Sequence, residues 1–361
     1  KFRSIPNQTY SSFQIINSVH VRRVNSIFEV KNNVFLRMLS YLFFVIKSFF
    51  ICLKQSNNVD IVITIAPLSS GIIGALIKKI NGTRHHFDVP DILPDLGIAA
   101  KMLKNRLLIF VLYKVEKWVY KNSDTISTCT KGQMKNLISK DVIPDKIFHI
   151  PDWVDITFFK NNRADYDKIC LSNYSYPGKK IISFFGNIGA LQNPEVFINV
   201  MQLIQEEGYN DILFLFFGDG IMLNTLKGIV KENNIKNIHF IGRVKREYIP
   251  SCMNLSDILI ANYIPNEHLD LYIPGKLFEY AISGTPILIG ARGDSKSMVE
   301  NYSLGTVVTP SNIEEFKNGI INILHSEYIY NPKIDEFIQD YSLDNVSRLY
   351  EDLICKNDKV K

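Results

Sequence analysis

Two series of short apolar runs, alternating with helical patterns, constrain the fold of this 361-residue chain most strongly. The first series has β-branched or apolar runs at 59–66, 85–89, 125–128 and 147–150. The second has runs at 180–185, 212–217, 238–241, 258–261 and 287–289. Alternation of this kind predicts parallel sheets with helices on both faces. We therefore expect an α/β protein with two doubly wound domains.

The length also favours two domains, because 361 residues exceed what one hydrophobic core usually serves. A polar, poorly patterned stretch at 161–180 separates the two series. We place a first domain at 1–156 and a second at 157–336. Residues 337–361 form a last helical region that we expect to pack back on the first domain.

Charge is distributed unevenly along the chain. Residues 1–156 contain 21 Lys and Arg against 11 Asp and Glu, whereas the remainder contains 20 against 25. A basic half can bind nucleic acid, anionic lipid or phosphorylated substrates. No segment resembles a nucleic-acid-binding motif, so lipid headgroups or a diphosphate are the better candidates.

The cysteines and the most apolar run indicate where in the cell the protein is located. Five scattered cysteines without metal-binding spacing predict reduced thiols in the cytoplasm, no disulfide framework and no metal site. No secretory signal is visible. The run 38–53 is interrupted by Lys47 and is shorter than the roughly 20 residues that cross a bilayer. It predicts a core helix or a membrane-surface helix rather than a span.

The stretch Pro274–Tyr280 (PGKLFEY) combines a cation and an acid at the start of a predicted helix, and Gly284-Thr285-Pro286 follows it. Lys276 and Glu279 are three apart and share a helix face. The helix N-terminus adds positive potential that suits a phosphate. A cation for a diphosphate and a carboxylate for ribose hydroxyls would hold a nucleotide sugar. The alternative is an ordinary solvated pair.

Glycine turns follow the strands predicted in the second domain. Gly186, Asn187 and Gly189 come directly after one strand, where backbone amides can approach a diphosphate. Asp219 lies between two glycines after the next strand, and Arg243 follows a third. Each has a simpler interpretation as a plain turn or a surface residue.

In the first domain, Asp91, Asp95, His85 and His86 cluster around one predicted strand end. A carboxylate there could position or deprotonate an acceptor hydroxyl. Alternatively, the aspartates cap turns, and we expect the histidines to be structural. The sequence has no Ser-His-Asp arrangement, P-loop or DxD-type motif, so metal-free stabilisation of a phosphate leaving group is the simplest chemistry.

These segments together resemble glycosyltransferase family 4, and especially its bacterial surface-polysaccharide branch, which includes N-acetyl-L-fucosamine transferases. The resemblance covers about residues 59–350. It includes Asp91–Asp95 (DILPD), Glu116–Asp124 (EKWVYKNSD), Ile150–Asp155 (IPDWVD), Phe185–Gly189 (FGNIG), Gly218–Gly220 (GDG), Pro274–Tyr280 and Gly284–Pro286.

The resemblance implies the GT-B fold, two Rossmann-like domains with the active site in the cleft between them. It implies a retaining, metal-independent transferase that moves a hexose or N-acetylhexosamine from a nucleotide sugar, commonly UDP-linked. Gly186, Asn187, Gly189, Lys276, Leu277 and Glu279 would then bind the donor, with Lys276, Arg243 and Asp91 as the residues closest to catalysis.

The acceptor that we expect is a lipid-diphosphate-linked oligosaccharide for capsule or O-antigen synthesis, at the cytoplasmic face of the plasma membrane. No cofactor beyond the donor substrate is expected, and no nucleic-acid partner.

The chain departs from the family pattern in three places. Leu271, preceded by Asp270, stands where the family has the first of two glutamates. The loop GNIGALQNP lacks the family's usual Arg and Lys, and we expect the opening strand of the first domain to be missing. Two alternatives therefore stay open: a UDP-N-acetylglucosamine 2-epimerase-like isomerase, and a non-catalytic partner that binds a sugar nucleotide.

Overall fold

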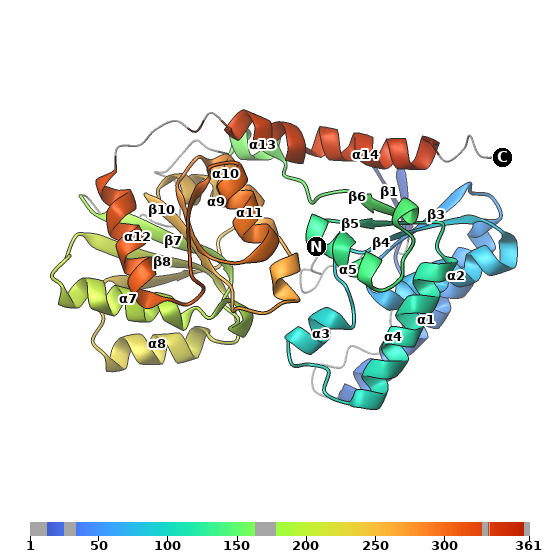
Figure 1. Ribbon diagram of the computed structural model, residues 1–361, viewed down its shortest axis with the longest axis horizontal. Coiled ribbons are helices and arrows are strands. Elements are labelled where there is room, and N and C mark those ends of the chain that lie inside the picture. Colours follow the sequence, from blue (N-terminus) through green and yellow to red (C-terminus); the bar gives the residue numbers. More distant parts are fainter. Residues whose placement is uncertain (1–12, 25–33, 163–177, 327–330, 332, 357–361) are drawn as a thin grey trace. The chain divides into compact units, whose positions relative to one another are not determined.

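The computed structural model describes residues 13–24, 34–162, 178–326, 331 and 333–356. It separates into two compact units, one made of 1–91 with 111–126 and the other of 92–110 with 127–361. Figure 1 labels the helices and strands along the chain. The boundary that we placed after residue 156 stays a prediction.

The first four-stranded sheet has the strand order β3-β4-β5-β6. Its strands are β3 (Ile61–Ile65), β4 (Arg84–Asp88), β5 (Thr125–Thr128) and β6 (Ile147–His149). The helices along this part of the chain are α2 (Leu68–Asn81), α3 (Asp95–Ala99), α4 (Arg106–Asn122) and α5 (Lys131–Ser139). β3 and β4 pair in parallel, as the β-branched runs predicted.

Helix α2 approaches β4 closely because a glycine faces the sheet. A Cβ atom at Gly74 would lie 2.1 Å from Nε2 of His85, so a larger residue would push the helix away. The helix ends at Gly82, which has a φ of 75° and donates its N–H to the Lys78 carbonyl. This left-handed glycine is a typical C-terminal cap.

The described N-terminal residues contribute a hairpin and a long helix. β1 (Phe13–Ile16) and β2 (Val19–Arg22) pair antiparallel in a sheet of their own. Helix α1 (Val34–Ser56) is 23 residues long, longer than the run that the sequence suggested. Its stretch Leu39–Ser56 is, within the described residues, the one stretch long and apolar enough to cross a membrane, and only 11% of it is buried. The core-helix alternative is therefore wrong for α1.

The second sheet has six parallel strands in the order β12-β11-β10-β7-β8-β9. They are β7 (Lys180–Asn187), β8 (Ile212–Asp219), β9 (Ile238–Gly242), β10 (Ile258–Asn262), β11 (Ile287–Gly290) and β12 (Gly305–Val308). Read from the other edge, the order is that of a dinucleotide-binding Rossmann sheet. The two Rossmann-like domains expected from the sequence are present, and the second is doubly wound. In the described residues the first sheet instead runs in chain order, without a reversal.

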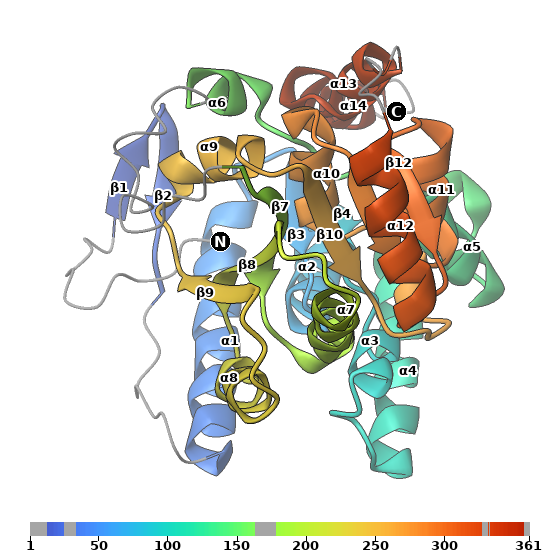
Figure 2. The same ribbon diagram turned by 90° about the vertical axis from the view of Figure 1, so that its left-hand side faces the viewer.

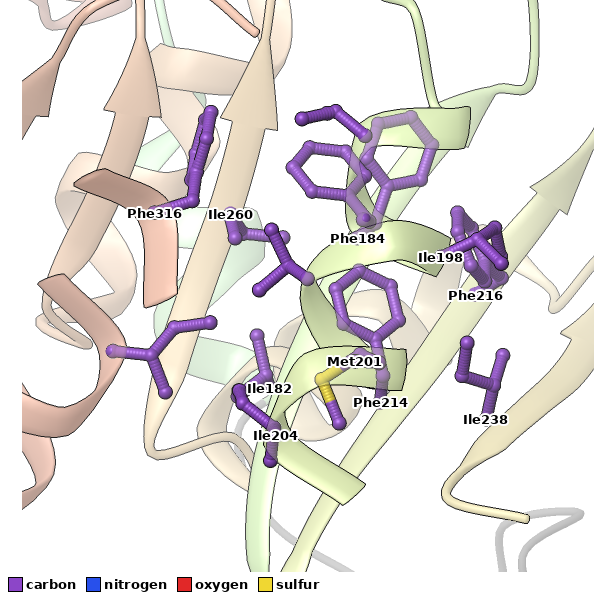
Figure 3. Close-up of a cluster of buried hydrophobic side chains, with 14 of the residues drawn as sticks. Ile182, Phe184, Ile198, Met201, Ile204, Phe214, Phe216, Ile238, Ile260 and Phe316 are labelled. Carbon is purple, nitrogen blue, oxygen red and sulfur yellow. The ribbon is translucent and has the colours of Figure 1, made fainter. Parts of the chain in front are cut away.

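Helices cover both faces of this second sheet (Figure 2). They are α7 (Glu195–Glu206), α8 (Leu223–Glu232) and α12 (Ile313–His325) on one face, and α9 (Ile249–Asn254), α10 (Gly275–Ser283) and α11 (Gly293–Asn301) on the other. Successive strand residues point to opposite faces. Phe184 and Phe216 accordingly pack toward α7 (Figure 3), whereas Phe185 and Phe217 pack toward α10.

The chain ends in helices α13 (Ile334–Tyr341) and α14 (Leu343–Lys356), and α6 (Ile156–Asn161) begins at the Asp155 cap. In the second unit, Ile150 forms a small buried cluster with Val346 and Leu353 of α14. The sequence-based expectations omitted β12. They also omitted α12, although Asn312 caps it by accepting the Glu315 N–H.

Candidate functional site

The connections of the second sheet reverse direction between β7 and β10. β7 leads outward to β8 and β9, while β10 leads outward to β11 and β12 on the other side. In such sheets ligands bind beyond the carboxyl ends of the strands at this switch point. The strand ends there carry Gly186 and Asn187 on β7 and Asn262 on β10.

Glycines bring the loops after β7 and β8 together at this edge. Gly218 pairs with Gly186 across the two strands, and a Cβ on Gly218 would lie 1.8 Å from the Gly186 carbonyl oxygen. A Cβ on Gly220 would lie 2.2 Å from the Ile188 carbonyl oxygen. Gly186 and Gly218 also have φ values of 125° and 136°. Glycine is therefore required for this close loop packing.

Lys276 reaches these loops from the first turn of α10. Its Nζ lies 4.0 Å from the centroid of the Phe184 ring and donates a 2.8 Å hydrogen bond to Oε1 of Gln192. A methyl group on Gly186 would lie 3.2 Å from the same Nζ. The ammonium thus sits on an aromatic face beside the glycine loop, where cation–π attraction supports it.

The surroundings of Lys276 disfavour its charged form. Burial lowers the pKa of its amine from 10.5 to about 7, and no charged neighbour shifts it back. No ion pair joins Lys276 to an acid within the described residues. An ammonium without a counterion at a glycine-lined strand edge is suited to an incoming anion.

Hydrogen bonds from the ends of β10 and neighbouring segments fix the loop that carries Gln192. The Asn262 side chain is fully buried, donates to the Gln192 carbonyl at 3.0 Å and accepts the Ser311 N–H at 2.8 Å. The Ile264 N–H donates to the Leu191 carbonyl at 3.0 Å. Sequence reasoning missed both Gln192 and Asn262. A polar residue at the end of the apolar strand 258–261 was the available signal for Asn262.

Glu279 lies one turn after Lys276 on α10 and is partly buried. Burial raises the pKa of its carboxyl, and the Arg246 guanidinium, 4.0 Å away, opposes that shift. Arg246 itself lies 5.0 Å from the centroid of the Phe158 ring. The sequence singled out Glu279 but not Arg246, whose significance depends on this contact.

Arg243 forms a salt bridge with Asp219, with 2.9 Å between Nη2 and Oδ2. Both side chains are substantially exposed, and Asp219 also accepts the Gly220 N–H at 2.8 Å. The charge of Arg243 is thus already compensated, unlike that of Lys276. Its predicted role as a diphosphate cation stays a prediction.

The remaining predicted donor residues differ in accessibility. Asn187 is exposed at the end of β7, with its Nδ2 beside Gly189, which is buried. Leu277 is fully buried in the core, and its N–H donates to the Pro274 carbonyl. Leu277 therefore presents neither its side chain nor its N–H to a ligand, and it serves to anchor α10.

Leu271 and Asp270 occupy the place of the family's missing first glutamate. Asp270 Oδ2 lies 3.2 Å from Nη2 of Arg292, and burial raises the pKa of this carboxyl while Arg292 lowers it. Asp270, the acid nearest in sequence to the position of the missing glutamate, is thus paired with an arginine.

The residues predicted on the acceptor side separate into exposed and buried groups. Asp91 is exposed just past β4, and Asp95 is buried at the start of α3. Asp95 Oδ2 accepts from Asn136 at 3.1 Å and lies 3.0 Å from Lys140 Nζ. Asp95 is thus held by an internal cation.

Both histidines are fully buried. His85 lies 2.7 Å from the Thr64 hydroxyl, and His86 lies 2.8 Å from the Thr125 hydroxyl. Burial lowers the pKa of each imidazole to about 4. Both are neutral at physiological pH and structural, as the sequence indicated.

In the part of the chain that the structure describes, no group of three or more His, Cys, Asp or Glu side chains could hold a metal ion. The expectation of metal-independent chemistry stays a prediction.

Residues 169–340 match the family model Glycosyl transferases group 1. The chain is 25% identical over 288 residues to the putative colanic acid biosynthesis glycosyl transferase WcaI of Escherichia coli K12, covering 77% of this chain and 69% of that protein. It is 24% identical over 319 residues to an Escherichia coli UDP-Gal:alpha-D-GlcNAc-diphosphoundecaprenol alpha-1,3-galactosyltransferase, covering 84% and 78%.

Among solved structures, the fold is similar to that of Anabaena Alr3699/HepE in complex with UDP. The TM-score is 0.69 at 13% identity, covering 90% of this chain and 84% of that one. This likeness concerns the fold.

Proposed function

We propose, on the premise that residues 169–340 form a Glycosyl transferases group 1 domain, that the protein is a retaining glycosyltransferase of surface polysaccharide biosynthesis. The donor would be a UDP-linked hexose or N-acetylhexosamine. The acceptor would be a lipid-diphosphate-linked oligosaccharide in capsule or O-antigen synthesis. The named relatives WcaI and the diphosphoundecaprenol galactosyltransferase support the polysaccharide setting and the lipid-linked acceptor.

The observation that carries this proposal is the Lys276 ammonium, which has no counterion among the residues that the structure describes and lies beside Gly186 at the switch point of the second sheet. A donor diphosphate would supply the missing negative charge. Negative charge on the diphosphate grows as the sugar–phosphate bond breaks, so a fixed cation stabilises the transition state more than the ground state. In a retaining reaction, the acceptor hydroxyl would attack from the face that the nucleotide leaves.

The roles of the other residues follow from their positions. Glu279, one turn along α10, would bind the ribose hydroxyls, and Asn187 with the Gly186–Gly189 loop would approach the phosphates. Arg243 could add charge only by leaving Asp219. Asp91 would act on the acceptor side. In this scheme Lys276, rather than a metal ion, supplies positive charge to the leaving diphosphate.

Helix α1 supports a peripheral place on the membrane. Its exposed apolar side chains recur at helical spacing on one face: Leu39, Leu42, Phe43, Ile46 and Phe50. Lys47 and Lys54 line a hollow of about 750 Å³ with Phe43, Phe50 and Arg22 of β2. The helix contains no acidic residue. Apolar side chains beside cations suit the interface of an anionic membrane, at the cytoplasmic face.

Vesicle flotation tests this membrane proposal. Liposomes with anionic phospholipid should bind the wild type, and Phe43→Asp with Phe50→Asp should abolish binding. Ile143→Asp, at an exposed residue outside α1, is the matched control. Equal binding of the paired phenylalanine variant would reject α1 as the contact.

One observation favours a second candidate, a sugar-nucleotide-binding partner without turnover. Asp270, the acid nearest the missing glutamate position, is paired with Arg292, so donor-sugar hydroxyls would lack a free carboxylate there. Nucleotide binding without transfer or hydrolysis in the full-length protein would support this candidate over the enzyme.

A donor panel tests the proposed function. Purified protein is incubated with UDP and GDP sugars and a synthetic lipid-diphosphate GlcNAc acceptor, and the anomeric configuration of any product is determined by NMR. We expect transfer from a UDP-sugar with retention. Inversion would reject the mechanism, and appearance of an epimerised donor would favour the isomerase. If no nucleotide sugar binds at all, the proposal fails.

A further inference from the structure

Gln192 is the polar partner of the Lys276 amine. The Nζ–Oε1 distance is 2.8 Å, and Gln192 and Lys276 are 84 positions apart in the sequence. The amide oxygen accepts a hydrogen bond from the amine whether or not the amine carries its extra proton. Gln192 therefore fixes the position of Nζ without adding negative charge to the site.

The position of Gln192 is itself fixed. Its N–H donates to the Gly189 carbonyl at 3.1 Å, and its carbonyl accepts from the buried Asn262 side chain at 3.0 Å. Asn193 Nδ2 donates to the Ser311 hydroxyl at 3.0 Å. These bonds join the loop after β7 to the segments after β10 and β12. The Gln192 amide is thus presented from a rigid support on the same edge as the glycine loop.

Charged groups near the site are engaged elsewhere. Asp219 at the end of β8 pairs with Arg243, which follows β9. Glu279 on α10 itself lies 4.0 Å from Arg246. Residues 187–193 of the β7 loop, which include Gln192, contain no ionisable side chain.

We propose that Gln192 is a positioning residue of the donor site, which holds the Lys276 amine at the Gly186 loop in neutral surroundings so that a bound diphosphate draws a proton from solvent onto Nζ. The proposal rests on the proposed function, in that Lys276 is taken to contact the diphosphate. It adds a role for Gln192 and a proton linked to binding.

A neutral amide suits this role better than an acid would. A carboxylate at position 192 would keep Lys276 protonated but would neutralise it, and the diphosphate would then have to displace that carboxylate. With the amide, the diphosphate is the first counterion that the amine meets. Burial, which lowers the pKa of the free Lys276 amine to about 7, is consistent with this arrangement.

Isothermal titration with UDP, in buffers of different ionisation enthalpy, tests the proposal. Wild type should take up nearly one proton at pH 8.5, where the UDP phosphates are fully ionised, as a pKa near 7 in the free protein requires. UDP affinity should then fall by up to about tenfold per pH unit above pH 7. Lys276→Arg, which stays charged, should show neither effect.

Two variants of Gln192 move the pH profile in opposite directions. Gln192→Glu should raise the Lys276 pKa, reduce proton uptake at pH 8.5 and weaken UDP binding at pH 7 by about tenfold. Gln192→Ala should move the fall in affinity toward lower pH. Gln202→Ala, at a surface glutamine of α7 bonded to Glu206, is the matched control.

The outcomes separate this proposal from the function on which it rests. If Lys276→Ala leaves UDP binding unchanged, the proposed donor site is wrong. If Lys276→Ala weakens binding while both Gln192 variants shift affinity equally at every pH, Gln192 has only a structural role and the present proposal is rejected. Circular dichroism melting of each variant confirms that it is folded.

Discussion

A buried or partly buried charged side chain lies at each of two strand-end loops of this protein. The two differ in whether an oppositely charged side chain lies beside it. After β4, Asp95 is buried with Lys140 at 3.0 Å and Asn136 at 3.1 Å. Beside the β7 loop, Lys276 has an aromatic ring and a neutral amide but no acid in the described part of the chain. A buried charge with an internal counterion is engaged by the fold, and removing its partner is costly, whereas a charge without a counterion is available to a ligand. The predictions below test this difference.

The largest expected effect is on catalysis. Lys276→Ala should slow sugar transfer by about 10³-fold, or about 4 kcal/mol, because the cation that stabilises the leaving diphosphate is lost. Initial rates with the active donor measure the effect. Lys296→Ala removes a surface lysine that pairs with Glu300, and it should leave the rate unchanged.

Asp95→Ala should act on stability instead. Removing the carboxylate leaves Lys140 and Asn136 without their shared acceptor, so we expect the free energy of unfolding to fall by about 2 kcal/mol. Urea denaturation measures this loss. UDP affinity should not change, and a large loss of affinity would mean that Asp95 belongs to the donor site.

Gly186→Ala should lower both the stability of the fold and the affinity for UDP. The residue has a φ of 125°, and a methyl group there would lie 3.2 Å from Lys276 Nζ. Strain should lower the free energy of unfolding by about 1–2 kcal/mol, and the displaced ammonium should bind UDP less tightly. Gly82→Ala also has a positive φ but meets nothing within 4 Å, so it should cost stability without changing UDP affinity.

The pH dependence of stability should also reveal Lys276. Its pKa is lowered to about 7 in the folded protein, so between pH 7 and 10.5 the unfolded chain binds the extra proton and stability rises with pH. Lys276→Met lacks this contribution and should be more stable than wild type at pH 7. The difference in free energy of unfolding between the variant and wild type should narrow by about 1 kcal/mol per pH unit from pH 7.5 to 9. A constant difference would contradict the lowered pKa.

The smallest effect is expected at Arg243. Its guanidinium is exposed and paired with Asp219, so Arg243→Ala should weaken UDP binding by about twofold or less. Calorimetric titration measures the change. A loss as large as that of Lys276→Ala would show that Arg243 leaves Asp219 for the diphosphate and would remove the contrast between the two cations.

Much of the fold followed from local patterns in the sequence. The predicted strand 125–128 and helix 131–139 coincide with β5 and α5, and Lys276 and Glu279 do share the first turns of α10. Period-two and helical spacing are local, so a single sequence carries them.

The partners in the site could not be predicted in the same way. Gln192 meets Lys276, Arg246 meets Glu279 and Asn262 meets the Gln192 carbonyl only because the strands bring distant segments together. The pairing of Arg243 with Asp219 likewise depends on two neighbouring strand ends. Charge compensation is a tertiary property, and it decides which charged residues remain available.

The affinity ratio between UDP and uridine tests the central claim most directly. Both ligands carry the same base and ribose, so their ratio isolates the contribution of the diphosphate. Wild type should prefer UDP by about 100-fold at pH 7, and Lys276→Ala should bind the two almost equally. A Lys276→Ala protein that keeps the wild-type ratio would contradict the assignment of Lys276 as the diphosphate-binding cation.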